Sequence, residues 1–298
     1  MHIIRTNLAA GIVAATGAML FGQTALAQTE GGVALRVEGF GGIARDQRPI
    51  SGNDGEFSGG VLPSIGFRLG GVATVQMDGM VASHLKDTVF AGAGHIGIKA
   101  TENLSIGAYG SYTHFDAVPK LDTYRIGGEA VYHAGRVSVS VLAGYEHSDR
   151  ATVVAGSIPG FTVLDRYGKS GSFFSMADVS FYPSDNWSLT AGHRFVGRRH
   201  AAALGTEKAF TGSGLSLFAE GRIGEQGYAA VWTGIRIKFG RRGPSLQASD
   251  QSGYINRLKD ELFVPANTRS RTLVAPPPPP PPPPPTGGNG ACCGACYT

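Results

Sequence analysis

The sequence predicts an all-β protein whose strands close into an antiparallel transmembrane β-barrel of about twelve strands. Three observations carry this prediction: an export signal, long segments in which apolar and polar residues alternate, and a low content of charged residues. Charged residues make up 16% of the 298 positions, whereas an ordinary soluble domain has about 25%. The 45 glycines show no Gly-X-Y period, which excludes a collagen-like chain. After residue 27 no apolar run approaches the roughly 18–20 residues of a membrane-spanning helix, so a helical membrane protein is excluded as well.

Residues 1–27 have the pattern of a secretory signal peptide. Arg5 supplies the basic start, an apolar run from Leu8 to Phe21 follows, and Ala25-Leu26-Ala27 is a small-x-small cleavage site. The alternative, a transmembrane anchor, is disfavoured because two glycines interrupt the short run. We therefore expect the chain to be exported.

Residues 28–240 contain the alternating segments, as expected for strands with one apolar and one polar face. In residues 228–239, for example, Ile235 and Ile237 share one face and Arg236 lies on the other. The segments run for about 10–12 residues, roughly twice the usual strand length. A tilted strand needs about 9–11 residues to cross a bilayer.

Aromatic residues gather near the ends of these segments, where a membrane barrel carries its interfacial girdles. They are Phe90, Tyr112, Tyr124, Tyr132, Tyr145, Phe181, Trp187 and Phe239. Lipid offers no hydrogen bonds to an open sheet edge, so a sheet that spans a membrane has to close on itself.

Twelve segments qualify as strands, and a bacterial single-chain barrel is expected to have an even number. They are 33–42, 61–69, 71–83, 89–99, 103–114, 122–133, 136–147, 172–183, 186–197, 199–209, 212–222 and 227–239. Counted from the periplasm, the external connections include the long ones at 43–60 and 148–171, whereas the periplasmic ones are all short, which is the usual asymmetry. The segments 61–69 and 199–209 are the weakest, and without both of them the barrel would have ten strands.

A soluble β-sandwich or lipocalin-like barrel is the alternative fold, and it would turn its charges outward. If the apolar face meets lipid instead, the charges line the lumen, because Arg or Lys against lipid costs about 2–4 kcal/mol near the midplane. The alternation assigns these charges to the lumen: Arg36, Glu38, Asp78, Lys99, Arg125, Glu129, Glu146, Asp178, Arg194, Glu220, Arg222, Arg236 and Lys238.

Gln76 and His95 share this polar face. The two signs of charge nearly balance, and these residues can pair within or across strands, as in Arg36/Glu38, Arg125/Glu129 and Glu220/Arg222. Such a lumen favours a cross-linked polar plug or a narrow channel over a wide, strongly selective pore.

Residues 241–270 are expected to form a periplasmic segment with one short amphipathic helix over 250–263. Tyr254, Leu258 and Leu262 recur there at helical spacing. The helix would cover the periplasmic rim of the barrel or dock into its mouth.

Residues 271–298 form a proline- and cysteine-containing tail. Ten consecutive prolines at 276–285 predict a polyproline II rod of about 31 Å, which serves as a spacer or as a ligand for a proline-binding domain. Cys292, Cys293 and Cys296 are the only cysteines of the chain. An odd number leaves one thiol for an intermolecular disulfide, and a metal site of four thiolates would need two tails. Redox chemistry of the last two cysteines and no chemical role at all are the other readings.

The sequence holds no motif that indicates a cofactor, and it predicts no metal site apart from the option at the tail cysteines. His193 with Ser188 or Thr190 comes nearest to a hydrolase constellation, although this pairing is arbitrary. The net charge of +4 comes from dispersed residues, which argues against a nucleic-acid partner.

Three stretches, 192–205, 216–223 and 231–239, together with the signal peptide and the alternation, resemble Gram-negative outer-membrane β-barrels. The chain is similar to the porin-like and small OmpA-type barrels of alphaproteobacteria over residues 28–240. The resemblance implies an outer-membrane location and a barrel, but no particular activity, because such barrels differ in their loops and lumens.

The leading functional hypothesis is therefore a narrow porin-like channel for small solutes or ions, in contact with outer-membrane lipid. The second is a structural or surface-interaction barrel with a plugged polar lumen, anchored in the envelope by a periplasmic tail that meets a cell-wall or periplasmic partner. The third is an outer-membrane hydrolase. The sequence does not predict an oligomeric state.

Overall fold

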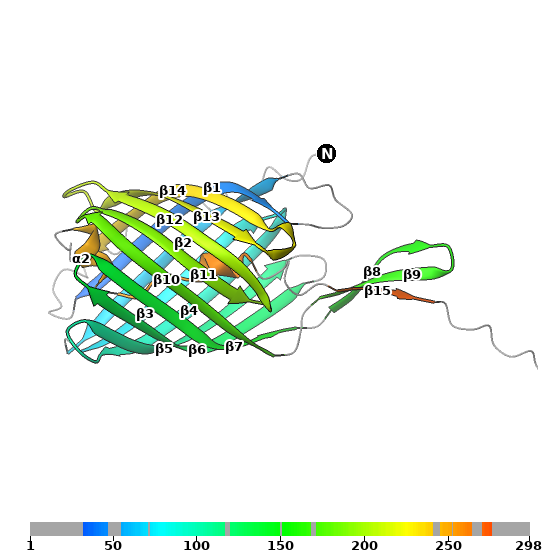
Figure 1. Cartoon of the computed structure of the whole chain (residues 1–298), viewed down its shortest axis with the longest axis horizontal. Coiled ribbons are helices and arrows are strands. Elements are labelled where there is room, and N and C mark those ends of the chain that lie inside the picture. Colours follow the sequence, from blue (N-terminus) through cyan, green and yellow to red (C-terminus); the bar gives the residue numbers. More distant parts are fainter. Residues whose placement is uncertain are drawn as a thin grey trace, which may run out of the picture.

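The computed structural model describes residues 32–46, 55–70, 72–116, 120–149, 151–167, 171–240, 245–251, 253–263 and 270–275. Twelve of the strands in this part form a closed barrel in which every neighbouring pair is antiparallel (Figure 1). In chain order they are β1 (Val33–Arg45), β2 (Glu56–Leu69), β3 (Ala73–His84), β4 (Asp87–Lys99), β5 (Leu104–Asp116), β6 (Leu121–Ala134), β7 (Val137–Ser148), β10 (Ser172–Ser184), β11 (Trp187–Val196), β12 (Arg199–Ala209), β13 (Leu215–Gly224) and β14 (Ala229–Gly240). A 3-10 turn, η1 (Glu225–Gly227), joins the last two, and β14 pairs with β1 to close the cylinder.

Each of the twelve segments predicted from the alternation is a strand of this barrel. The two weakest, 61–69 and 199–209, are included, so the barrel has twelve strands rather than ten. β2 begins earlier than predicted, because the residues from Glu56 onward pair with the end of β1.

Large apolar side chains point away from the barrel axis. Ile43, Ile126 and Ile223 are 62%, 68% and 71% exposed. The same outer surface carries Met77, Phe90, Ile96, Ile106, Tyr112, Tyr124, Tyr132, Val141, Tyr145, Phe173, Val179, Phe181, Trp187, Leu204, Leu217, Val231 and Ile235. An apolar band around a whole barrel is the surface of a protein that spans hydrocarbon. This orientation excludes the soluble-barrel alternative.

The two ends of the barrel differ in the length of their connections. One end, called here the short-turn end, holds the connections 70–72, 100–103, 135–136, 185–186 and 210–214 and the end of β14. Gly70 and Gly135 have φ of 58° in these turns, a conformation that glycine adopts without steric cost. The other end, called the long-connection end, holds the two longest connections, 46–55 and 149–171.

The connection 149–171 contains a hairpin that the alternation did not predict. Its strands are β8 (Ala151–Ile158) and β9 (Phe161–Tyr167), with Gly160 at positive φ in the turn. A third strand, β15 (Ser270–Val274), comes from the carboxy-terminal part of the chain and pairs with β9. This small sheet lies beyond one end of the barrel (Figure 1).

The single helix predicted over 250–263 is wrong. Two short helices, α2 (Leu246–Asp250) and α3 (Leu258–Glu261), take its place, and the described residues between them belong to no helix or strand. Helix α2 lies at the end of the barrel opposite the small sheet (Figure 1), and every residue of α3 is buried. No helix of the described residues is long and apolar enough to cross a membrane.

The predicted signal peptide at 1–27 lies outside the described residues. The polyproline run at 276–285 and the three cysteines lie outside them too. These predictions stay untested by the structure.

Candidate functional site

The polar face of the strands lines the lumen. Glu38, Asp78, Arg125, Glu129, Glu146, Asp178, Arg194 and Arg222 are buried there, and Arg36, Glu220, Arg236 and Lys238 are half-buried. Lys99 is the exception, because it is the last residue of β4 and is exposed at the short-turn end. Gln76 and His95 are buried among the same charges.

The described residues of 245–263, called here the inner segment, fill part of this lumen. The segment starts at the short-turn end, where Ser245 caps α2 by accepting a hydrogen bond from the amide of Ala248. The amide of Gln247 donates to the carbonyl of Asp185 at 3.0 Å, and the amide of Leu246 donates to the side chain of Asn186 at 3.1 Å. The inner segment is thus fixed to the turn between β10 and β11.

Tyr254 is held by the opposite wall of the barrel. Gln76 on β3 donates from Nε2 to the carbonyl of Tyr254 and accepts from its amide at Oε1, both at 3.2 Å. The Tyr254 ring stacks on His95, with 5.4 Å between centroids and 11° between planes. Gly97 and Gly107 leave the space for its hydroxyl, since a Cβ at Gly107 would lie 2.9 Å from that oxygen and one at Gly97 would lie closer still.

His95 connects two carboxylates across strands β3 to β6. Its Nε2 lies 3.1 Å from Asp78 Oδ2, and its Nδ1 lies 3.0 Å from both oxygens of Glu129. Gln76 adds a hydrogen bond of 3.0 Å to Asp78. Buried carboxylates are costly without such partners, so this group fixes the wall against which Tyr254 lies.

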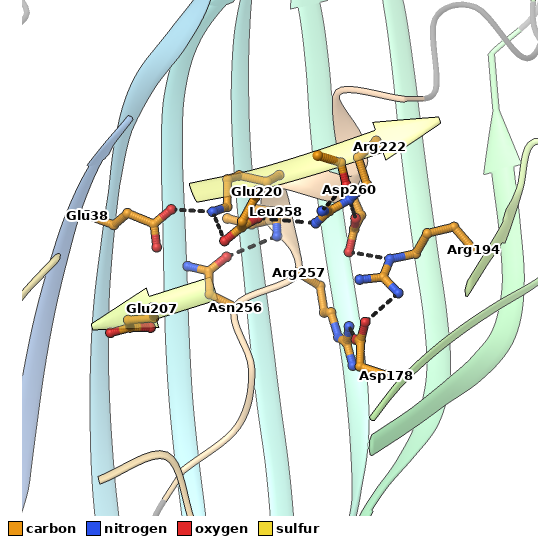
Figure 2. Close-up of polar contacts among 12 residues, drawn as sticks. Glu38, Asp178, Arg194, Glu207, Glu220, Arg222, Asn256, Arg257, Leu258 and Asp260 are labelled. Carbon is orange, nitrogen blue, oxygen red and sulfur yellow. Dashed lines mark hydrogen bonds and ion pairs between the residues drawn. The ribbon is translucent and has the colours of Figure 1, made fainter. Parts of the chain in front are cut away.

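Charged residues of the inner segment pair with the wall at the middle of the lumen (Figure 2). Arg257 donates to Asp178 and, at 2.8 Å, to Ser140. Asp260 lies between Arg194 and Arg222, with Nε atoms 2.9 and 3.0 Å from its two oxygens. Arg194 also pairs with Asp178 at 2.8 Å, so charges of both signs alternate through this network.

Lys259 extends the network to the strands that close the barrel. Its Nζ lies 2.6 Å from Glu38 on β1 and 2.5 Å from Glu220 on β13. Arg236 on β14 pairs with Glu38 at 2.6 Å and also with Glu207. Each acidic group of this wall therefore meets a cation from the inner segment or from a neighbouring strand.

The inner segment ends near the long-connection end. Glu261 lies 2.5 Å from Arg125, which also pairs with Glu146 at 3.1 Å. The Phe263 ring packs edge-on against Tyr228, with 4.6 Å between centroids, and lies beneath the guanidinium of Arg199. Both partners stand where β12 and β14 begin.

A cavity of about 970 Å³ remains between the inner segment and the wall. Most of its wall residues stand toward the short turns: no residue of β14 before Arg236 lines it, and none of β7 after Ser140. Arg194, Ala203 and Arg222 line it nearer the long connections. Asn256, Arg257, Lys259 and Asp260 bound it on the inner side. The lumen is thus a vestibule that opens toward the short turns and narrows where the buried residues of α3 meet the wall.

The hydrolase constellation considered from the sequence is not formed. On β11 Ser188 is buried and faces inward, whereas His193 is exposed and contacts His200 at 3.0 Å. A different pair, Ser58 and His84, lies 2.8 Å apart, with the Trp232 indole donating to the serine at 2.8 Å. Ser58 is fully buried and does not line the cavity, so this contact serves the packing of the wall. Within the described ranges, no group of three or more metal-ligating side chains is present.

Comparison with known proteins gives likenesses of shape only. No family model and no curated protein matches the chain. Among solved structures, a KdgM porin in complex with disordered oligogalacturonate is 7% identical, with 68% of this chain and 99% of that chain covered and a TM-score of 0.48. The translocator domain of the autotransporter NalP from Neisseria meningitidis is 12% identical (78% and 97% covered, TM-score 0.44), and an outer membrane channel from Pseudomonas putida F1 is 10% identical (72% and 98% covered, TM-score 0.44). At these identities and TM-scores the likenesses do not identify a function.

Proposed function

We propose that this protein is a porin-like barrel of the Gram-negative outer membrane whose path for small solutes or ions is held closed by its own inner segment. The apolar outer surface and the closed twelve-stranded sheet support a membrane-spanning barrel. The predicted signal peptide supports export. We orient the barrel with its short turns facing the periplasm and its long connections facing outward, as in other bacterial outer-membrane barrels.

The observation that carries the closed state is the position of α3. The vestibule reaches the level of Lys259 and Asp260, where ion pairs join these two residues to Glu38, Glu220, Arg194 and Arg222 on the wall. A wall with both signs of charge favours neither cations nor anions strongly. Opening requires that these pairs exchange for water or ions, which links conduction to movement of the inner segment.

A second candidate function is a permanently filled barrel with a structural or display role. The number of ion pairs between the inner segment and the wall favours it, because an inner segment that moves out of the lumen would have to break all of these contacts. The two functions differ in one property, namely whether the lumen ever conducts.

Planar-bilayer recordings of the full-length protein test the proposal. We expect wild type to be closed for most of the time, with discrete openings at raised voltage, and Arg257→Gln combined with Asp260→Asn to be open for much longer. The matched control is Asp185→Asn, which removes an exposed partner of Arg136 and is expected to behave as wild type. If neither wild type nor the folded double variant conducts current at any voltage, the channel proposal is wrong and the permanently filled barrel is favoured.

A further inference from the structure

The polypeptide after β14 does not stay at the end of the barrel where β14 finishes. We infer that the barrel carries its own carboxy-terminal segment through the membrane and presents the chain beyond Val274 on the side of the long connections. This display is a further function, independent of solute passage. The assignment of the displayed chain to the outside of the cell rests on the barrel orientation given in the proposed function.

The segment enters at the short-turn end. β14 finishes there: Gly240 pairs with Ala34 at the start of β1, and the amide of Lys238 donates to Gly214 in the short turn before β13 at 2.8 Å. Helix α2 then binds the turn of Asp185 and Asn186. Entry from the long-connection end would require the chain to run back along the outside of the barrel, where the surface is apolar.

Contacts of the inner segment with the last strand run in reverse order along that strand. Asp250 pairs with Lys238 at 2.9 Å, close to the end of β14. Phe263 packs on Tyr228, the residue immediately before β14 begins. Between residues 250 and 263 the inner segment therefore covers the full length of β14, and with it the depth of the barrel.

Residues beyond the lumen are fixed on the far side. In β15 Ser270 pairs with Arg166 and Val274 with Thr162, so this strand extends the hairpin of the connection between β7 and β10. That connection joins the ends of strands that meet at the long-connection end. β15 lies with β8 and β9 beyond the barrel, at the end opposite α2 (Figure 1).

The position of β15 changes the expectation for the tail. A periplasmic tail was predicted because β14 ends at the short turns, but the described chain has crossed to the other end by Ser270. After Ala275 the sequence continues with ten prolines, and Cys292, Cys293 and Cys296 lie within its last seven residues. Its point of attachment, Ala275, puts these residues on the side of the long connections and gives the thiols a partner outside the cell rather than in the periplasm.

Thiol labelling of intact cells tests this inference. In a chain with Cys292→Ser, Cys293→Ser and Cys296→Ser, a single cysteine is placed at Leu273 in β15, a side chain that is 53% exposed. Two matched positions serve as references: Val154→Cys in β8, where the valine is 65% exposed, and Asp185→Cys in the short turn, where the aspartate side chain is 65% exposed. A membrane-impermeant maleimide is applied before and after permeabilisation of the outer membrane.

We expect Leu273→Cys and Val154→Cys to react in intact cells and Asp185→Cys to react only after permeabilisation. The native cysteines of the wild-type chain should also react in intact cells. If Leu273→Cys requires permeabilisation while Val154→Cys does not, the chain is not threaded and the inference is wrong. If the pattern of all three positions is inverted, the display on the outer side fails together with the proposed orientation, whatever the bilayer recordings show.

Discussion

Asp260 bridges two arginines that stand on different strands: its Oδ2 lies 2.9 Å from Nε of Arg194 on β11, and its Oδ1 accepts a hydrogen bond of 3.0 Å from Nε of Arg222 on β13. Strand β12 separates these two strands in the barrel. The carboxylate therefore ties the inner segment to a wide part of the wall. All three side chains are almost completely buried, which makes the loss of any one partner costly.

Replacement of Asp260 by Asn should weaken the folded protein and loosen the inner segment. The variant keeps the shape of the side chain but leaves two buried guanidinium groups without their shared carboxylate, and breaking a buried pair costs about 3–5 kcal/mol. Samples are heated to increasing temperatures before electrophoresis. The temperature at which the compact, fast-running form disappears should be clearly lower for the variant. Asp185→Asn, at an exposed pair, should change stability by about 1 kcal/mol or less. Equal midpoints for the two variants would contradict the bridging role of Asp260.

Charge on the outer surface should be tolerated only outside the membrane. Ile126 stands near the middle of β6 and is 68% exposed, so Ile126→Arg should lower the free energy of unfolding from lipid vesicles by about 2–4 kcal/mol. Val154 is similarly exposed at 65% but lies in β8, beyond the barrel. Val154→Arg should have little effect in the same urea titration. Similar losses for both variants would contradict the assignment of the outer surface to lipid.

Gln76 should control the backbone of the inner segment at Tyr254. Gln76→Leu removes the pair of hydrogen bonds to the Tyr254 amide and carbonyl and the bond to Asp78, while the volume of the side chain stays similar. Amide hydrogen exchange at 253–256 should become faster by about tenfold or more, because each lost bond contributes about 1 kcal/mol. Exchange in the middle of β6 should not change. Unaltered protection at Tyr254 would show that Gln76 does not hold it.

The strands and the direction of their faces could be predicted from the sequence, because a period of two over many residues is a strong signal. Pairing inside the lumen was predicted less well. Glu220 and Arg222 form the expected contact at 3.3 Å, but Arg125 pairs with Glu146, and Glu38 with Arg236. Both observed pairs are direct cross-strand neighbours in the register, which lie closer together than residues two apart on one strand. The register between strands is not visible in the alternation of a single segment.

The inner segment was predicted only in part, for a different reason. Leu258 and Leu262 have helical spacing, and this spacing predicted one helix that covers the periplasmic rim or docks into the mouth of the barrel, not a segment that passes along the lumen. In the structure Arg257, Lys259 and Asp260 are the residues that pair with the wall. Charges of both signs next to buried leucines were the available signal, because they match a lumen whose own charges nearly balance. β15 could not be predicted, since its partner lies about one hundred residues earlier, in a connection that showed no clear alternation.

The central claim is that the inner segment lies inside the barrel beside a defined wall, and cross-linking tests it most directly. Asn256 donates from its side chain to Ser64 Oγ at 3.0 Å, so a short bifunctional thiol reagent such as dibromobimane should join cysteines at these two positions within one chain. The measurement is mass spectrometry of the reagent-treated protein in native membranes, with the three tail cysteines replaced by serine. The account predicts a Ser64→Cys to Asn256→Cys cross-link and none between Asn256→Cys and Ser157→Cys in the outer hairpin. A folded barrel in which the first pair is labelled but never joined would contradict it.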